Sequence, residues 1–309
     1  MPRKFLLRIA INRYAEWRSL NGPVPESRQI EAVLIQRFGF EPGAICSLED
    51  EQATCERLRD GLLQWVGADG PSQEKLEREF GSDDLLILYS GHGYLDPLTD
   101  ESYWIPHDAG RNFKVRHAWF PHTELVKILR RLPFRHVLLI SDSCFAGRIL
   151  PKDLGETTER QQEDYPAIAA RYRSREVLVS VGAAESPDPS PFAEHLLDCL
   201  RHNDKPWLDR EDLYAWVRRG WPRVEHDGLR EAGHQRGGAL LLVPRGGNPA
   251  PNRGCGARRR HPAQDRSAPS AAGGPVARGG GGAGLGGDAA TLWVYDRGAA
   301  CMLFMWDTA

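Results

Sequence analysis

Two kinds of hydrophobic pattern alternate along the first 245 residues of the chain. Short runs of large and β-branched apolar residues predict strands at 5–11, 83–89, 135–140 and 176–181. Between them, apolar residues recur every three or four positions and predict helices at 26–38, 49–66, 123–132, 191–201 and 210–218. Such an alternation of strands and helices is typical of an α/β domain built on a parallel sheet.

Four further segments complete the predicted organisation. Residues 103–106 and 239–243 have strand-like patterns, the first ended by a proline. Residues 151–175 are charged and poor in large apolar side chains, so we expect a connector loop there. After residue 245 the chain contains no Lys, Glu or Ile and becomes rich in Gly, Ala, Arg and Pro. We therefore expect one domain over 1–245 and a disordered tail over 246–309, since that tail cannot bury a core.

The origin of the tail has two explanations that the sequence leaves open. It could be a linker to a further module, or the product of a reading-frame shift in GC-rich coding sequence. Sequencing the locus and translating the other two frames would distinguish them.

Two of the predicted strands run directly into reactive residues. The strand at 83–89 is followed by Ser90-Gly91-His92-Gly93, and the strand at 135–140 by Ser141-Asp142-Ser143-Cys144-Phe145-Ala146-Gly147. A right-handed crossover through one helix would place these strands side by side, with both motifs at the carboxyl edge of the sheet. A cysteine and a histidine that are distant in sequence but adjacent in space are typical of a cysteine hydrolase. Taken singly, each has a plain structural explanation, as a buried thiol or a hydrogen-bonded histidine.

The residues beside this pair lie at informative spacings. In extended chain, Ser90 shares a side with His92, and Asp142 shares a side with Cys144. We expect the glycines at 91 and 93 to let a substrate backbone approach, and Gly147 to allow a sharp turn after the cysteine.

Composition narrows the class of protein further. The chain is 41% hydrophobic and 27% charged with a net charge of -2, so nucleic acid and membrane surfaces are unfavoured partners. No apolar run reaches the ~18 residues that span a bilayer, and the basic N-terminus is more typical of a first strand than of a signal peptide.

The six cysteines show no zinc-type spacing, and we expect a cytoplasmic protein with reduced thiols. A nucleotide-binding domain is disfavoured because phosphate-binding glycine motifs are lacking.

The two motifs together resemble the signature blocks of the caspase-like cysteine peptidases, in the metacaspase and bacterial caspase-homologue branch. Three other segments resemble this family: Ile9-Ala10-Ile11-Asn12-Arg13-Tyr14, Ser102-Tyr103-Trp104-Ile105-Pro106-His107-Asp108-Ala109 and Pro191-Phe192-Ala193. The resemblance covers about residues 5–244 and implies a caspase-like three-layer α/β/α sandwich with a mostly parallel central sheet. The chain departs from the metacaspase pattern at Ala146, where a serine is usual.

The resemblance also implies roles for individual residues. Cys144 would be the nucleophile and His92 the acid/base, with the backbone N–H groups of Gly93 and Cys144 as the oxyanion hole. No third catalytic side chain is assigned. The pocket for the residue before the cleaved bond (P1) would be formed by Asp142, Ser90 and Glu26, the last standing where the family has an aspartate.

Charge predicts which peptide bonds are cleaved. A carboxylate at 142 opposes an acidic P1 side chain in a desolvated pocket, so cleavage after Arg or Lys is favoured. Asp142 could instead be a turn residue and Glu26 a carboxylate that stabilises a helix N-terminus. Basic residues of the connector are then candidate sites of self-cleavage: Lys152, Arg160, Arg171, Arg173 and Arg175.

The predicted chemistry requires no cofactor and no metal. Calcium is a candidate activator, since many metacaspases depend on it and Asp96, Asp100, Glu101 and Asp108 follow the histidine motif. A solvated acidic loop is the favoured explanation of these four residues. The alternative function is a catalytically silent interaction module of the same fold, which intact Cys144 and His92 disfavour. The predicted partners are proteins or peptides with a basic P1 residue, and the sequence does not specify an oligomeric state.

Overall fold

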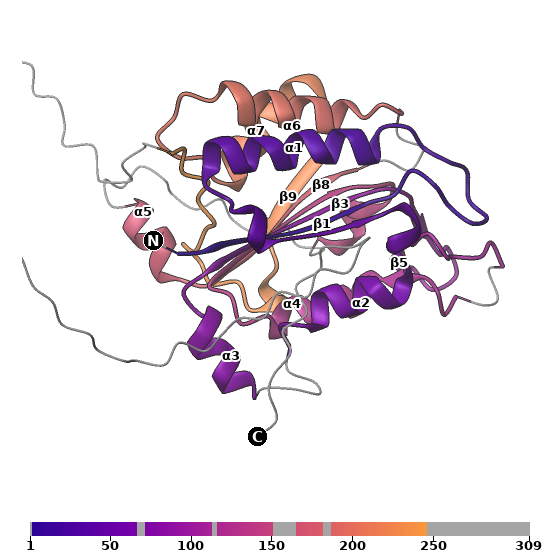
Figure 1. The fold of residues 1–309 in the computed structure, drawn as a ribbon, viewed down its shortest axis with the longest axis horizontal. Coiled ribbons are helices and arrows are strands. Elements are labelled where there is room, and N and C mark those ends of the chain that lie inside the picture. Colours follow the sequence, from indigo (N-terminus) through magenta and orange to yellow (C-terminus); the bar gives the residue numbers. More distant parts are fainter. Residues whose placement is uncertain (1, 67–71, 113–115, 151–164, 182–186, 246–309) are drawn as a thin grey trace, which may run out of the picture.

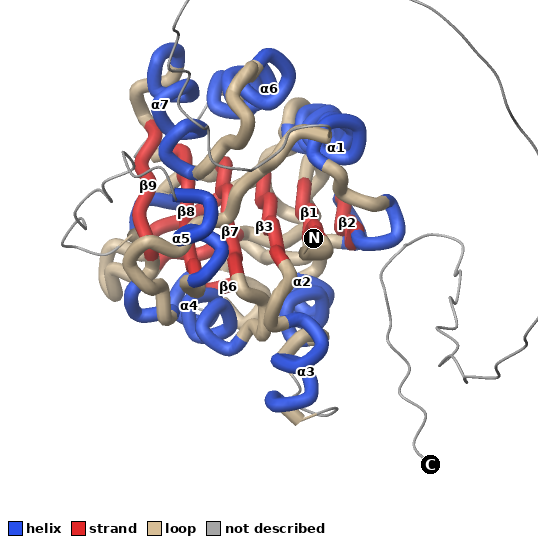
Figure 2. The backbone as a smooth tube through the Cα atoms, turned by 90° about the vertical axis from the view of Figure 1, so that its left-hand side faces the viewer, coloured by secondary structure: helices blue, strands red, loops and turns tan. Residues whose placement is uncertain are grey.

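The structure is a computed structural model that describes residues 2–66, 72–112, 116–150, 165–181 and 187–245. Its centre is a six-stranded sheet in the order β2-β1-β3-β7-β8-β9, seen along the strands in Figure 2. The strands are β1 (Lys4–Ala10), β2 (Ile45–Glu49), β3 (Asp84–Ser90), β7 (His136–Asp142), β8 (Ser174–Ser180) and β9 (Val224–Gly228). The first five are parallel, and β9 runs antiparallel to β8 at one edge.

Helices cover both faces of this sheet (Figures 1 and 2). One face carries α1 (Pro23–Phe38), α6 (Pro191–His202) and α7 (Arg210–Gly220), and the other carries α2 (Cys55–Leu63), α3 (Gln73–Phe80) and α4 (His122–Arg131). The short α5 (Tyr165–Arg171) lies at the amino ends of the strands, where the Ala169 carbonyl is 3.0 Å from His136 Nε2. The predicted three-layer α/β/α sandwich with a mostly parallel sheet is confirmed.

Smaller elements complete the chain. A second sheet contains β4 (Gly93–Leu95), β5 (Ser102–Trp104) and β6 (Phe120–Pro121). Within the described residues, the 3₁₀ turns are η1 (Pro42–Ala44), η2 (Asp50–Gln52), η3 (Ala146–Ile149) and η4 (Arg230–Ala232).

Alternate residues of the central strands face opposite layers of the core. Leu85 and Ile87 of β3 pack with the layer under α2 and α4, while Leu86 and Leu88 pack with the layer under α1 and α6. A strand that is buried on both faces needs apolar residues at every position, which explains the continuous apolar runs in the sequence. The same burial fixes the register of β3 and β7, so that Ser90 lies opposite Asp142.

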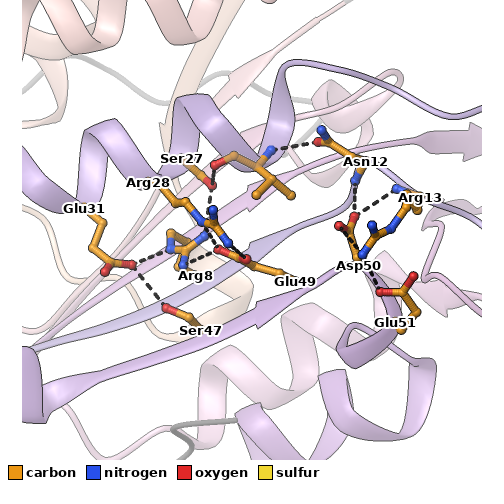
Figure 3. A network of polar contacts seen from close by, with 11 residues as sticks. Arg8, Asn12, Arg13, Ser27, Arg28, Glu31, Ser47, Glu49, Asp50 and Glu51 are labelled. Carbon is orange, nitrogen blue, oxygen red and sulfur yellow. Dashed lines mark hydrogen bonds and ion pairs between the residues drawn. The ribbon is translucent and has the colours of Figure 1, made fainter. Parts of the chain in front are cut away.

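One buried charge interrupts the apolar run of β1. Arg8 is 4% exposed and forms ion pairs with Glu31 of α1 and, at 2.7 Å, with Glu49 of β2 (Figure 3). Its guanidinium also donates to Ser27 Oγ at 3.1 Å. Because Ser27 lies in the first turns of α1, this network fixes the start of that helix against the sheet.

The structure corrects three sequence-based predictions of secondary structure and adds a helix that was not predicted. The predicted helix at 49–66 is shorter, because 45–49 forms β2 and 50–52 a 3₁₀ turn. The predicted strand at 239–243 makes only an isolated bridge between Leu208 and Leu242, and the edge strand is β9. The predicted connector ends before residue 165, where α5 begins, and α3 was not predicted at all. Residues 151–164 and the tail from 246 lie outside the described residues.

The prediction that Arg175 is a site of self-cleavage is wrong, because Arg175 is a buried structural residue. It is 1% exposed in β8, and its guanidinium donates to backbone carbonyls that include Leu129, Leu132 and Phe134. A protease cannot reach this bond in the folded protein. Arg173 also donates to the carbonyls of Arg130 and Leu132, whereas Lys152 and Arg160 lie outside the described residues.

Within the described residues, we find no helix that is both long enough and apolar enough to cross a membrane.

Candidate active site

The carboxyl ends of four neighbouring strands surround one cleft. This cleft is open to solvent. The residues that line it are Arg18, Leu20, Pro23, Glu26, Ser90, Gly91, His92, Asp142, Ser143, Cys144, Pro187, Asp188 and Ser190. They come from the segments that follow β1, β3, β7 and β8, where the parallel strands of an open α/β sheet form their binding sites. Ser90, His92, Asp142, Cys144 and Glu26, which the sequence suggested, all lie here.

Cys144 lies in the turn that leaves β7. It forms no disulfide and its side chain is partly exposed, whereas Cys55 and Cys199, which also form no disulfide, are buried. The turn depends on Phe145, which has a left-handed backbone with φ 60°. The prediction that Gly147 makes this turn is therefore wrong. A Cβ at Gly147 would lie 2.6 Å from Val181 Cγ1, so glycine is needed there for packing.

His92 is held from one side by the segment that follows β1. Its imidazole Nε2 is 2.7 Å from the Arg18 carbonyl oxygen, and its backbone N–H donates to the Tyr14 hydroxyl at 2.8 Å. The Tyr14 ring packs against the imidazole with 4.7 Å between the centroids. A carbonyl only accepts hydrogen bonds, so this contact puts the proton of a neutral imidazole on Nε2. Nδ1 then carries the lone pair.

The two glycines of the histidine motif are explained by contacts inside the protein. A Cβ on Gly91 would lie 2.5 Å from the Tyr14 hydroxyl oxygen, and one on Gly93 would lie 2.0 Å from the Cys144 carbonyl oxygen. The expectation that these glycines make room for a substrate backbone is replaced by this packing requirement. The contact at Gly93 also shows that the two motifs lie against each other.

Three carboxylates form one wall of the cleft. Asp142 is 7% exposed, and its Oδ2 is buried without a hydrogen-bond partner among the described residues. Glu26 accepts a hydrogen bond from the Ser190 backbone N–H at 2.9 Å through Oε1, while its Oε2 is buried without a partner in the same part of the chain. Asp188 has both oxygens occupied, since it accepts from the backbone N–H groups of Asn21 and Gly22.

Burial raises the pKa values of two of these carboxylates, Asp142 and Glu26. Desolvation raises the pKa of Asp142 to about 6, partly offset by the hydroxyls of Ser190 and Ser180. Desolvation also raises the pKa of Glu26 to about 7, with further contributions from the charges of Asp142 and Asp188. The hydrogen bonds that Asp142 and Glu26 accept thus offset only part of the cost of placing these two carboxylates in the cleft.

Because burying the ionised Asp142 carboxylate lowers the free energy of unfolding, we predict that Asp142→Asn stabilises the unliganded protein. The folded state binds the Asp142 proton more tightly than the unfolded chain. The free-energy cost of the buried charge is therefore small near pH 4 and grows until the pH exceeds about 6. Its full size is about 3 kcal/mol. We expect urea denaturation to give the variant an advantage of about 1–3 kcal/mol at pH 8 that shrinks toward pH 4. A difference that does not change with pH would contradict this electrostatic explanation.

Sequence reasoning missed four groups that lie in the cleft or hold His92. Tyr14 and the Arg18 carbonyl lie in a segment without a catalytic motif, and a backbone carbonyl leaves no trace in a sequence. Asp188 follows a proline and precedes another, which suggested only a loop. Ser190 could have been recognised, because Ser190-Pro191 before a helical pattern is a capping signal, and its hydroxyl caps α6.

Each of the acidic residues after the histidine motif makes a contact within the protein. Asp96 pairs with Arg116, Asp100 with Arg148, and Glu101 accepts from the Thr123 backbone N–H. Asp108 accepts from the Cys55 backbone N–H at 2.9 Å. Among the residues that the structure describes, no group of three or more His, Cys, Asp or Glu side chains is arranged to hold a metal ion.

Comparison with curated proteins finds a similarity to a metacaspase. The chain is 25% identical over 217 residues to metacaspase-6 of Arabidopsis thaliana, an alignment that covers 65% of this chain and 53% of that protein. The chain thus spans about half the length of this curated relative. No family model matches the sequence.

Solved caspase structures align with the chain over a similar extent. Caspase-1 from Spodoptera frugiperda has a TM-score of 0.46 at 15% identity, covering 71% of this chain and 76% of that one. A structure described as pro-sf-caspase-1 has a TM-score of 0.41 at 14% identity, covering 70% and 76%.

Proposed function

We propose that this protein is a cysteine endopeptidase that cleaves peptide bonds after Arg or Lys, with Cys144 as nucleophile and His92 as acid/base. The observation that carries the proposal is a cleft that contains both residues together with the carboxylates of Asp142, Glu26 and Asp188. The similarity to a metacaspase supports the class of chemistry.

The hydrogen bond from His92 Nε2 to the Arg18 carbonyl supports the role of the histidine. It leaves Nδ1 as the basic nitrogen, which takes the proton of the Cys144 thiol as the sulfur attacks the substrate carbonyl carbon. The carbonyl oxygen becomes an oxyanion, stabilised by the backbone N–H groups of Gly93 and Cys144. The imidazolium then gives its proton to the departing amine, and the C–N bond breaks to leave a thioester on Cys144.

Hydrolysis of the thioester restores the enzyme. His92 Nδ1 takes a proton from water, and the resulting hydroxide attacks the thioester carbonyl. The C–S bond breaks, the acid product leaves and the proton returns to the sulfur. The Arg18 carbonyl keeps the ring oriented and stabilises the imidazolium in both steps. A third catalytic side chain has this role in other hydrolases.

The carboxylate wall supports a basic P1 residue. A guanidinium has five N–H donors, and Asp142 Oδ2 and Glu26 Oε2 are two buried acceptors that lack a partner within the described residues. A second, small recess shares Glu26, Ser90 and Asp142 with the cleft and is otherwise lined mainly by apolar residues of β3, α1 and α6.

The proposal is tested with fluorogenic peptides that differ only at P1. We expect kcat/KM for the Arg and Lys peptides to exceed that for the Asp peptide by at least about 100-fold, since a like charge in this pocket costs several kcal/mol. Each assay is run with calcium and with a chelator, because activation by calcium stays a prediction. Equal turnover of the Asp peptide would refute the assigned specificity, and no turnover under either condition would favour a silent interaction module.

A further inference from the structure

The loop that follows β1 carries both groups that hold His92. This loop, residues 12–21, projects past the carboxyl ends of the strands before α1 begins (Figure 1). It contains the Tyr14 hydroxyl and the Arg18 carbonyl, which accept hydrogen bonds from the backbone and the ring of His92. The orientation of the imidazole therefore depends on where this loop lies.

Asp50 fixes the start of the loop. Its Oδ1 accepts hydrogen bonds from the backbone N–H groups of Asn12 at 2.8 Å and Arg13 at 2.9 Å (Figure 3). Its Oδ2 lies 3.2 Å from the Arg13 guanidinium. Asp50 directly follows β2 and has a left-handed backbone with φ 46°, a conformation that aspartate tolerates better than most residues. Two hydrogen bonds to one carboxylate oxygen set the direction in which the chain leaves β1.

Asn12 connects the start of the loop to its far end through hydrogen bonds. Its carbonyl accepts from the Leu20 backbone N–H at 2.8 Å, and its side-chain amide donates to the Asn21 carbonyl at 2.9 Å. The side-chain oxygen accepts from the Val24 backbone N–H at 2.8 Å. The two ends of the loop thus meet at Asn12, and Arg18 lies just two residues before that closure.

We propose that Asp50 is a positioning residue for His92 and acts through the 12–21 loop. Asp50 is not among the residues that line the cleft, so it touches neither substrate nor thiol. The inference rests on the proposed role of His92. His107 also holds the loop, through the Arg13 carbonyl and the Ala15 backbone N–H, so loss of the Asp50 carboxylate should shift the loop without unfolding it.

Three variants separate positioning from simple stability. Asp50→Gly removes the acceptor and still permits φ 46°, whereas Asp50→Asn keeps an acceptor oxygen and also tolerates that backbone. Glu51→Ala is the control, because it removes only the exposed ion pair with Arg13. We measure kcat and KM with an Arg peptide below the melting temperature of every variant. The second readout is the pH profile of Cys144 alkylation by iodoacetamide, mapped by mass spectrometry.

We expect Asp50→Gly to lower kcat by about 10- to 100-fold with KM changed less than about 3-fold, because small misplacements of a reacting group have effects of this size. Its alkylation profile shifts to higher pH, while Asp50→Asn and Glu51→Ala remain within about 3-fold of wild type. Unchanged kcat in Asp50→Gly, or a lower melting temperature with an unchanged alkylation profile, overturns the inference. If wild type hydrolyses no peptide but Asp50→Gly still shifts the profile, the proposed peptidase function fails and the positioning role stands.

Discussion

Replacing Cys144 by alanine is expected to lower hydrolysis of an Arg peptide by at least about 10⁴-fold, the usual cost of removing a covalent nucleophile. Alanine deletes the sulfur that forms the thioester and leaves the cleft and its carboxylates in place. The fold should be unaffected, because the Cys144 side chain is partly exposed and forms no disulfide. The measurement is kcat/KM with the same peptide on both proteins, with circular dichroism as evidence that the variant is folded.

Cys199→Ala is the matched control for this experiment. Cys199 lies in α6, is fully buried, and has a thiol whose pKa is raised to about 12 by desolvation. It should remain protonated and inert, so the control should hydrolyse the peptide within about 3-fold of wild type. If Cys144→Ala is folded and retains the activity of the Cys199→Ala control, Cys144 is not the nucleophile.

Asp142→Asn is expected to have the second largest effect, and to act on specificity. The substitution keeps the size of the side chain and removes the buried charge that would pair with a guanidinium. Losing one partner of such a buried pair costs about 2–5 kcal/mol, which is a loss in kcat/KM of roughly 30-fold to several thousand-fold. The loss should appear with Arg and Lys peptides and be much smaller with a peptide that has a neutral P1 residue.

The pH dependence of wild type gives an independent check on Asp142. Because its pKa is about 6, kcat/KM for the Arg peptide should rise as the pH is raised through that value. Asp204→Asn is the control, since it removes an exposed carboxylate on a surface loop and changes the net charge equally. Equal losses with basic and neutral peptides would indicate that Asp142 supports the nucleophile rather than the pocket.

The activity and stability predictions for Asp142 are linked. The same unpaired charge that binds a basic side chain destabilises the empty protein, so Asp142→Asn should be more stable and less active. One substitution is expected to have opposite effects on stability and function where a binding site contains a buried charge that is paired only when the ligand is bound.

The sequence predicted the central part of this fold because β3 and β7 are buried on both faces. Their continuous apolar runs fix both the strands and the register that places Ser90 beside Asp142. The edges were harder to predict. β2 and β9 contain charged residues, such as Glu49 and Asp227, because edge strands face solvent on one side. Tertiary pairing, rather than local pattern, makes them strands.

The candidate site was predicted where its groups are side chains next to strand ends. His92 and Cys144 were found because each directly follows an apolar run. The groups that orient His92 were not found, because the Arg18 carbonyl is a backbone group and Asp50 acts through contacts between distant segments. Asp188 was missed because only the folded chain brings the segment before α6 against Asn21 and Gly22.

The most direct test of the whole account is labelling with peptidyl acyloxymethyl ketones, which alkylate the nucleophile of a cysteine peptidase. The protein is incubated with reagents that carry Arg or Asp at P1, and the modified residue is located by mass spectrometry. We predict a single adduct on Cys144 that forms at least about 100-fold faster with the Arg reagent, as the buried carboxylates require. An adduct on another cysteine, or equal rates with the two reagents, would contradict the account.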